Sequence, residues 1–173
     1  YTGMKNTIEV DIALQYTDSY NESIISFVNN VKTGDGGSHE VGFKTAITKV
    51  MNDYVKEHNL VKGKDKTFEG SDVREGLTAI ISVQIPEDLL QFEGQTKSKL
   101  GTPIARSITE SITTEKLHYF LEENKTIATK IVSKALKGKE AREAARKARE
   151  ESRKGKDSKK KEKLFFFFLL MDL

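Results

Sequence analysis

Apolar and polar residues alternate along residues 8–15, where the apolar positions are Ile8, Val10, Ile12 and Leu14. This period of two predicts a strand with one buried face. Residues 23–31 are rich in apolar residues and predict a second strand. The turn-forming residues 17–21 between them predict that the two strands pair as a hairpin. A nearly continuous apolar run over residues 77–85, ended by Pro86, predicts an interior strand.

Helical spacing of apolar residues follows the first two strands and returns in the second half of the chain. A helix is predicted from about residue 40 to 58, with one apolar stripe formed by Phe43, Ile47, Val50 and Tyr54. Residues 71–75 predict a single capped turn that ends at Gly76, and residues 62–66 form a polar stretch. Thr102 and Pro103 predict the N-cap and first residue of another helix. Its apolar positions are Ile104, Ile108, Ile112, Leu117, Phe120 and Leu121.

The order strand, strand, helix, strand, helix predicts an α+β fold, a two-layer α/β sandwich with helices packed on a sheet. A last helix begins near Thr126, with Ile127, Ile131 and Ala135 on one face, and becomes polar all round over residues 140–151. Alanines and opposite charges at helical spacing favour helix there without a core to bury. The fold is therefore expected to end in a C-terminal helical arm.

Charge is divided unevenly along the chain. Residues 125–163 contain 16 Lys and Arg against 6 Asp and Glu, whereas residues 1–124 contain 13 against 19. A basic arm on an acidic globular part is typical of contact with a polyanion. Residues 154–163 are interpreted as a lysine-rich linker, and residues 164–173 as a Phe-rich apolar tail too short to span a bilayer. An abnormal chain end and a membrane-surface anchor both stay open for this tail.

Composition excludes several classes of site. The chain has no cysteine, so it has neither disulfides nor thiolate metal sites. Its three histidines (His39, His58, His118) lie far apart and form no His-x-x-x-His pair, so no metal site is expected, and His39 and His118 are interpreted as structural or exposed. No signal-peptide pattern is present, and a cytoplasmic location is expected. Because the chain begins with Tyr1, we expect it to be a piece of a longer protein.

Two glycine-containing segments are candidates for phosphate contact. In Asp35-Gly-Gly-Ser-His39 the Walker spacing is missing, so this segment is interpreted as a tight turn and helix cap. Residues 91–101 predict a surface loop that contains one amide, Gln95, and two ammonium groups, Lys97 and Lys99. Such groups can bind a phosphate, but lysine-rich loops are also commonly only solvated. Arg74 and Glu75 are expected to form local charge pairing.

The segment Phe92-Glu-Gly-Gln-Thr-Lys-Ser-Lys-Leu-Gly101 closely resembles the transducer-domain loop in the ATPase subunit of bacterial type IIA DNA topoisomerases, which is the B subunit of gyrase and of topoisomerase IV. Further segments resemble this family in the same order, so that the resemblance spans about residues 6–163. They are Phe27-Val-Asn-Asn30, Asp35-Gly-Gly-Ser-His39, Asp72-Val-Arg-Glu-Gly-Leu-Thr-Ala-Ile-Ile-Ser82, Phe120-Leu-Glu-Glu-Asn124 and Ala141-Arg-Glu-Ala-Ala-Arg-Lys-Ala-Arg149. The run over residues 86–94 is more similar to the B subunit of topoisomerase IV than to that of gyrase.

The resemblance implies a transducer fold like ribosomal protein S5 domain 2, with residues 1–124 as an N-terminally incomplete core, 125–155 as a basic transducer helix and 156–173 as linker and tail. It also implies that Gln95 and Lys97 touch the γ-phosphate of ATP, while Lys99 is interpreted as a solvated or secondary charge. The arm would contact DNA phosphates without reading bases, and its candidate residues are Arg142, Arg146, Lys147 and Arg149.

In the family, ATP and Mg²⁺ are bound by the complete subunit, which couples ATP binding and hydrolysis to DNA-gate movement and duplex passage. Its partners are DNA, the A subunit in an A2B2 heterotetramer, and a second B subunit that joins by ATP-dependent dimerisation, with no membrane. The family's nucleotide-binding domain and Glu-Gly-Asp-Ser-Ala metal-binding motif are absent from these residues, so this chain alone is expected to be inactive and to bind no cofactor. The alternative is a freestanding S5-like nucleic-acid-binding module without enzymatic activity.

Overall fold

The computed structural model of the chain describes residues 1–61 and 67–171, and it describes the side-chain surroundings up to residue 154. The polar stretch 62–66 and the side chains of the lysine-rich linker and Phe-rich tail lie outside the described residues. The chain divides into two compact units, Tyr1–Gly138 and Lys139–Leu173.

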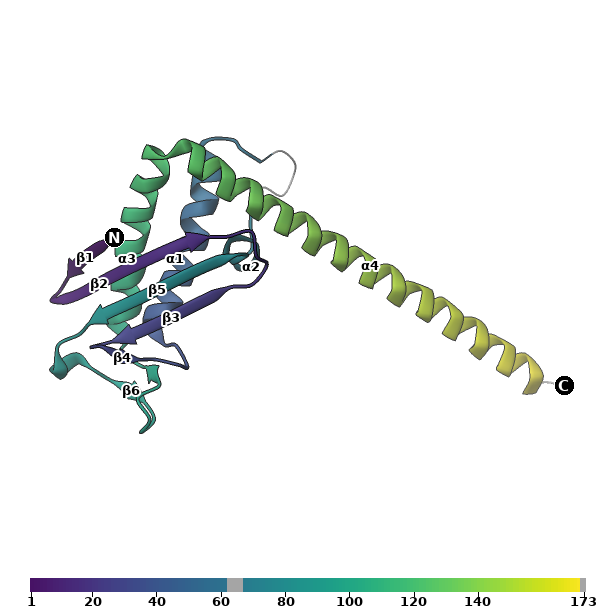
Figure 1. Ribbon diagram of the computed structural model, residues 1–173. Helices are drawn as coiled ribbons and strands as arrows, with labels where there is room; N and C mark the ends of the chain where they lie inside the picture. Colours follow the sequence, from purple (N-terminus) through teal and green to yellow (C-terminus); the bar gives the residue numbers. More distant parts are fainter. Residues whose placement is uncertain (62–66, 172–173) are drawn as a thin grey trace. The chain divides into compact units, whose positions relative to one another are not determined.

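The first unit is built on a five-stranded sheet (Figure 1). The spatial order of the strands is β1-β2-β5-β3-β4, with bounds β1 Thr2–Lys5, β2 Ile8–Tyr16, β3 Ser23–Val28, β4 Val31–Lys32 and β5 Leu77–Gln84. Two-residue turns with positive φ join β1 to β2 at Asn6 and Thr7, and β3 to β4 at Asn29 and Asn30. This geometry suits the twist of a tight hairpin. The predicted second strand is therefore split in two, and β1 was not predicted.

The predicted hairpin between β2 and β3 is wrong, because β5 lies between them. β5 pairs antiparallel with β2, from Glu9↔Gln84 to Tyr16↔Leu77, and parallel with β3. The chain does reverse direction after β2, as the turn residues predicted. However, β3 and β5 are parallel strands, which require a long crossover. The helices between them provide that crossover and bring β5 into the gap beside β2.

Helices α1, Ser38–Glu57, and α3, Pro103–Glu123, cover one face of the sheet, which confirms the two-layer α+β fold (Figure 1). They run in the same direction. At Gly42, near the start of α1, an added Cβ would collide with the backbone carbonyl oxygen of Arg106, near the start of α3. The predicted stripe of α1 is fully buried, as are β-strand residues on the covered face; these are Phe43, Ile47, Val50, Tyr54, Ile8, Val10, Ile12, Leu77, Ile81 and Val83.

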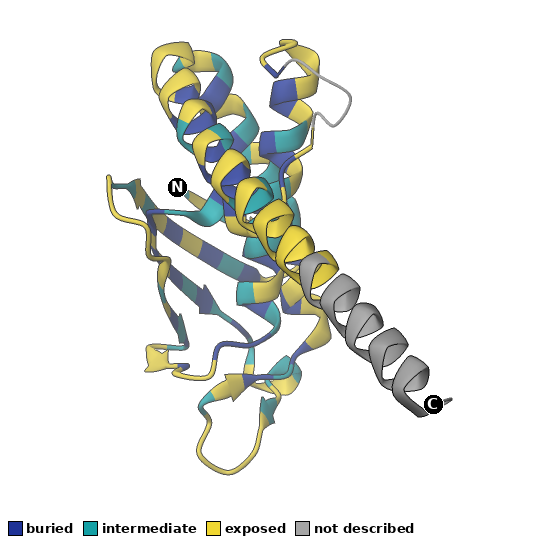
Figure 2. Ribbon diagram, turned by 90° about the vertical axis from the view of Figure 1, so that its right-hand side faces the viewer, coloured by how far each residue is buried: buried dark blue, intermediate teal, exposed yellow. Residues whose placement is uncertain are grey.

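The central strand buries only one of its faces. Along β5, buried and more exposed positions alternate (Figure 2). Ile80 on the uncovered face is 47% exposed. The predicted interior position of this strand is confirmed, and one of its faces is left uncovered. On α3, Ile108 and Ile112 are buried as predicted, but Ile104 and Phe120 are 36% and 40% exposed.

Helix α4, Lys125–Met171, begins in the first unit and continues through the second. Its first turns are buried in the core of the first unit through Ala128, Ile131, Val132 and Ala135, whereas Ile127 is exposed. The first unit, which extends to Gly138, therefore includes the start of this helix. The backbone remains helical across residues 156–163, where a linker was predicted. Over the described residues, none of the helices combines the length and apolarity that crossing a bilayer requires.

Candidate functional site

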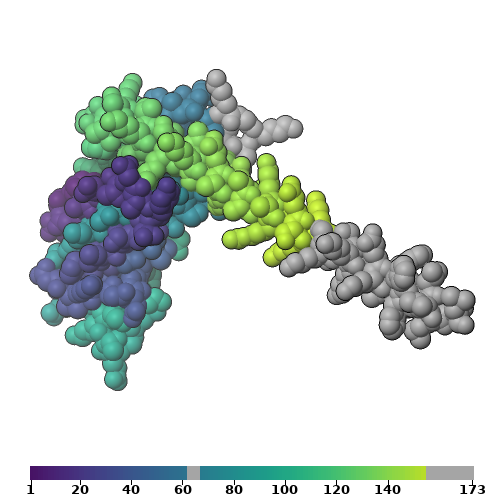
Figure 3. Space-filling model, turned by 45° about the vertical axis from the view of Figure 1, so that its right-hand side comes forward, coloured from purple at the N-terminus to yellow at the C-terminus, as the bar shows by residue number. Residues whose placement is uncertain are grey.

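Residues 91–101, here called the ribbon, form a hairpin that projects from the first unit (Figure 3, teal). The predicted loop contains two short strands, β6 Phe92–Glu93 and β7 Lys99–Leu100, paired as Phe92↔Leu100 and Glu93↔Lys99. Residues 94–98 make the tip. Gly94 and Lys97 both have positive φ, 80° and 52°, so the tip turns through backbone conformations that few non-glycine residues adopt.

The ribbon is fixed at its base to the loop that precedes α1. The amide of Leu100 donates to the carbonyl of Gly36 at 3.0 Å, and the amide of Asp35 donates to the carbonyl of Ser98 at 2.9 Å. The hydroxyl of Ser98 donates to the Asp35 carboxylate at 2.5 Å. Leu100 itself is buried. At Gly37, φ is 143° and an added Cβ would lie 2.5 Å from both the amide nitrogen and the carbonyl oxygen of Leu100. Only glycine permits this close approach.

Thr102 occupies the N-cap position of α3 as predicted, but its hydroxyl does not cap the helix. The hydroxyl donates to the carbonyl of Leu89 at 3.1 Å and accepts from the amide of Gln91 at 2.9 Å. The amides of Gly101 and Thr102 in turn donate to the carbonyl of Gln91. Pro103 is the first helical residue, as predicted. Thr102 therefore joins the two ends of the ribbon. Its buried hydroxyl serves this connection rather than capping of the helix.

The two tip residues singled out by the sequence have free side chains. Gln95 and Lys97 are exposed, and within the described residues neither side chain has a hydrogen bond or ion pair. Lys99 differs, because its ammonium group lies 2.7 Å from the Glu93 carboxylate on the facing strand. That hydrogen bond raises the pKa of Lys99. The amide and the first ammonium are thus available to a ligand, whereas the second ammonium is occupied.

An open cleft of about 510 Å³ lies beside the ribbon base. Both acidic and basic side chains line it: Asp35, Glu40, Glu93, Lys44, Lys99 and Arg106. The glycine turn at its edge places Gly37 at the N-cap of α1 without a side-chain cap, and the Glu40 carboxylate lies against Gly36. A carboxylate therefore already occupies the positive end of the helix dipole. The segment is a tight turn, and this carboxylate opposes the binding of a phosphate there.

His39 is buried under this turn and belongs to a polar network. Its Nε2 lies 3.2 Å from the Thr33 hydroxyl, which is 2.6 Å from the Ser26 hydroxyl, and Ser26 donates to Glu40 at 2.7 Å. Burial lowers the pKa of His39 to about 4, so the imidazole is neutral at physiological pH. The interpretation of His39 as structural agrees with this environment.

Arg74 was expected to form a local charge pair, but it pairs with a residue far away in the sequence. Its guanidinium Nε donates to the Glu22 carboxylate at 2.9 Å, and Lys44 lies 3.2 Å from the same carboxylate. Burial of the Glu22 carboxylate raises its pKa, but the hydrogen bonds and charges of these two cations together outweigh burial and hold the pKa below its usual range. The pair joins α2, Gly70–Arg74, to the start of β3, and no sequence pattern connects residues so far apart.

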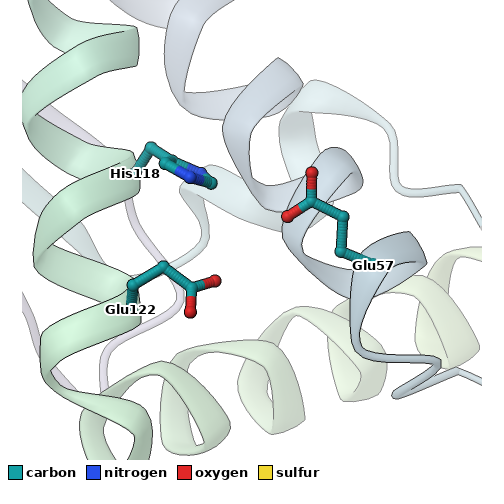
Figure 4. A group of neighbouring side chains, drawn as sticks. All are labelled: Glu57, His118 and Glu122. Atoms are coloured by element: carbon teal, nitrogen blue, oxygen red, sulfur yellow. The ribbon is translucent and has the colours of Figure 1, made fainter.

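Sequence reasoning expected no metal site and missed one group of potential ligands. Glu57, His118 and Glu122 place one donor atom each within 4.8 Å of one another (Figure 4). The only local signal was the spacing of His118 and Glu122, four residues apart on one helix, which places both on the same face. The contribution of α1 to this group required the packing of two helices.

In the second unit, α4 presents the predicted basic residues on its surface. Arg146, Lys147 and Arg149 are exposed and Arg142 is half-buried. Arg142, Arg146 and Arg149 follow the helical spacing i, i+4, i+7 and therefore share one face. Arg146 lies 3.9 Å from Glu150, an exposed pair that costs little to separate.

The fold matches part of two solved bacterial ATPase regions, one from gyrase B and one from topoisomerase IV. The structure matches the 43K ATPase domain of Thermus thermophilus gyrase B, solved with an aminocoumarin, with a TM-score of 0.79 and 40% identity over 86% of this chain and 39% of that chain. It also matches the topoisomerase IV ATP-binding domain of Francisella tularensis, with a TM-score of 0.73 and 25% identity over 82% of this chain and 38% of that one.

Sequence comparison identifies the family. The profile described as DNA gyrase B matches residues 1–151, and the chain therefore belongs to the DNA gyrase B family. It is 60% identical over 162 residues to the B subunit of DNA topoisomerase 4 from Bacillus subtilis, covering 94% of this chain and 25% of that protein. The corresponding protein of Staphylococcus epidermidis is 62% identical over 145 residues. The chain thus spans about a quarter of the length of these relatives, and the match favours the topoisomerase interpretation over a freestanding nucleic-acid-binding module.

Proposed function

We propose that this chain is the transducer part of the B subunit of an ATP-dependent type II DNA topoisomerase of the topoisomerase IV type. Residues 1–124 would form the core of a domain like ribosomal protein S5 domain 2, residues 125–155 the transducer helix, and residues 156–173 the linker and tail. In the complete subunit this part would couple ATP binding and hydrolysis to DNA-gate movement and the passage of a duplex. The fragment alone would not turn over ATP.

The observation that supports this proposal is the free pair of side chains at the ribbon tip. Gln95 offers amide donors and Lys97 an ammonium group, both exposed and unpartnered among the described residues. Donors and a positive charge placed together stabilise the charge of a transferring terminal phosphoryl group. We therefore assign Gln95 and Lys97 to the γ-phosphate of ATP held by the preceding domain of the complete subunit.

The fixed base of the ribbon suits the transmission of movement. Because Ser98 and Leu100 are hydrogen-bonded to the loop before α1, a force on the tip reaches the helix layer through short contacts. A contact that exists only with the triphosphate bound can bias a two-state rotation of the domain. Loss of the γ-phosphate would release the tip and the bias together.

ATP would enter the complete subunit with Mg²⁺, and the tip fits the nucleotide rather than the metal. It offers an amide and an ammonium group, and the nearest ribbon carboxylate, Glu93, is paired with Lys99. Mg²⁺ prefers oxygen ligands and substrate phosphates, so its protein ligands would come from other parts of the complete protein. When bound, the ion supplies charge neutralisation at the phosphates.

The basic face of α4 supports a role in contacting DNA. Arg142, Arg146 and Arg149 share one helix face, and Arg153 continues the same spacing. Together with Lys147 they would neutralise phosphates and position a duplex without reading its sequence. The expected partners of the whole protein are DNA, the A subunit in an A2B2 assembly, and a second B subunit joined by ATP-dependent dimerisation.

The test compares two lysines on the same ribbon in the complete subunit. Lys97→Ala should lower ATP turnover by at least tenfold, because one phosphate contact to an ionised group is lost, worth about 1.5–3 kcal/mol. Lys99→Ala is the matched control. It removes the same charge two residues further along the ribbon, from an ammonium group that is already paired with Glu93. Both variants should unfold at the urea concentration of the wild type. Wild-type turnover in Lys97→Ala, or an equal loss in Lys99→Ala, would remove the tip from the mechanism.

A further inference from the structure

The C-terminal ends of α1 and α3 bring nitrogen and oxygen donors together on one side of the first unit. Glu57 is the last residue of α1, and His118 and Glu122 lie in the last two turns of α3. Their donor atoms are within 4.8 Å of one another, and Figure 4 shows the three side chains converging from the two helices. The two glutamates and one imidazole therefore form a compact group that neither helix provides alone.

Two members of the group are available to a ligand. Within the described residues, neither ring nitrogen of His118 makes a hydrogen bond, and the Glu57 carboxylate has no hydrogen-bond or ion-pair partner. Glu122 is held in place from the other side, because Nε2 of His58 lies 2.7 Å from its Oε1. His58 is itself held against the ring of Tyr54, with 4.4 Å between ring centroids. One carboxylate oxygen of Glu122 is thus oriented by an imidazole while the other remains free.

This arrangement resembles the outer shell of known metal sites, where ligating carboxylates are hydrogen-bonded by a second residue that fixes their orientation. The helix ends favour a cation as well. α1 ends at Glu57 and α3 ends at Glu123, so the negative ends of two parallel helix dipoles meet beside the group. The dipoles and the two carboxylates act in the same direction.

The distances are compatible with a shared ion. A tetrahedral zinc site has metal–ligand distances of about 2.0–2.2 Å, which places its donor atoms about 3.4 Å apart. The donors here lie within 4.8 Å, so each must move by about 1 Å or less toward a common centre. Glu57 is exposed, so rotation about its side-chain torsions can bring its carboxylate closer without a change in the backbone.

We propose that Glu57, His118 and Glu122 bind one divalent first-row transition-metal ion, with His58 as the residue that positions Glu122. Mixed imidazole and carboxylate donors without thiolates select Zn²⁺, Ni²⁺ or Cu²⁺ over Mg²⁺ and Ca²⁺, which prefer all-oxygen sites. The ion would tie the end of α1 to the end of α3, next to the start of α4. The site is separate from the ribbon and does not depend on the proposed function.

The experiment titrates the full chain, without a histidine tag and after treatment with a chelator, with Zn²⁺ alone in a calorimeter. We expect one ion per chain, a rise in the urea midpoint when Zn²⁺ is present, and no competition by excess Mg²⁺. Co²⁺ in place of Zn²⁺ should give the visible absorption of a bound low-symmetry site. His118→Gln and Glu122→Gln should abolish the binding, and His58→Gln should weaken it by about 10–100-fold, as for other outer-shell residues.

Glu123→Gln is the matched control, because it removes the same charge at the next position of α3 and lies outside the group. It should bind Zn²⁺ as the wild type does. Glu57→Gln, at an exposed position, tests the site even if His118→Gln lowers the metal-free urea midpoint. Absence of saturable binding, binding that survives in His118→Gln and Glu57→Gln, or an equal loss in Glu123→Gln would each overturn the proposal.

Discussion

Gly37 is the position at which a single methyl group should disturb the ribbon most. Its φ of 143° and ψ of −165° lie in a region that only glycine occupies readily. An alanine Cβ would also lie 2.5 Å from both the nitrogen and the carbonyl oxygen of Leu100. These are backbone atoms of β7, so a side-chain rotation cannot relieve the contact, and the ribbon base must move away from α1.

The cost of Gly37→Ala follows from these two effects. Backbone strain of this kind costs about 1–3 kcal/mol and overpacking of a well-packed site a similar amount, so we expect a loss of about 2–5 kcal/mol. With a urea dependence of about 1–3 kcal/mol per molar, the unfolding midpoint should fall by about 1–2 M. The movement of the base should also displace Gln95 and Lys97, and with them the proposed contact to the γ-phosphate.

Gly34→Ala provides the control for this prediction. Gly34 lies three residues earlier in the same loop, has no neighbouring atom within 4 Å of an added Cβ, and does not have a positive φ. Urea unfolding followed by circular dichroism should show its midpoint unchanged, because such a substitution alters the free energy of unfolding by no more than about 0.5 kcal/mol. Equal midpoints for the two variants would refute the conclusion that the contact between Gly37 and Leu100 fixes the ribbon.

Three further predictions concern buried and charged positions. Burial lowers the pKa of His39 to about 4 in the folded chain, so between about pH 6.5 and pH 4 the unfolded chain binds one more proton than the folded chain. The free energy of unfolding should therefore be highest above about pH 6.5 and about 2 kcal/mol lower at pH 5. The contribution of His39 is measured as the difference between the urea midpoints of the wild type and His39→Gln at each pH. The same pH dependence in both proteins would contradict the prediction. Gly42→Ala should lower the free energy of unfolding by about 1–3 kcal/mol, because the carbonyl of Arg106 blocks the new methyl group, although alanine has the better helix propensity. An unchanged urea midpoint would refute the close contact between α1 and α3. In the complete subunit, Arg146→Ala with Arg149→Ala should lower the slope of log affinity for DNA against log salt by about two, equally for unrelated sequences; an unchanged slope would exclude phosphate contacts there.

Local signals in the sequence predicted most helices and strands well, but they predicted poorly which strands pair with one another. The stripe of α1, the start of α3 at Pro103 and the central strand were all readable, since periodicity and proline act within a few residues. The neighbours of β5 were not, because residues 17–21 specify a reversal of the chain but not the strand beside which it returns. That choice depends on the crossover through α1. β1 was missed because its four residues show no alternation.

For the candidate site too, local features were predictable from the sequence, whereas contacts between distant segments were not. The exposure of Gln95 and Lys97 could be predicted from the polar loop between Pro86 and Pro103, and the structure agrees. The attachment of the ribbon could not, because Ser98 bonds to Asp35, 63 residues earlier. For the donor group at the helix ends, the spacing of His118 and Glu122 was visible, but the third member comes from a different helix.

The central place of β5 also constrains the order of events during synthesis. Its partners in β2 precede it by 61 residues at Tyr16 and Leu77 and by 75 at Glu9 and Gln84. At translation speeds of about 5–20 residues per second, β2 and β3 wait several seconds with an unpaired edge each. Nascent chains stalled before residue 77 would therefore expose two apolar strand edges at once, a substrate for chaperones or for aggregation rather than a partly finished domain.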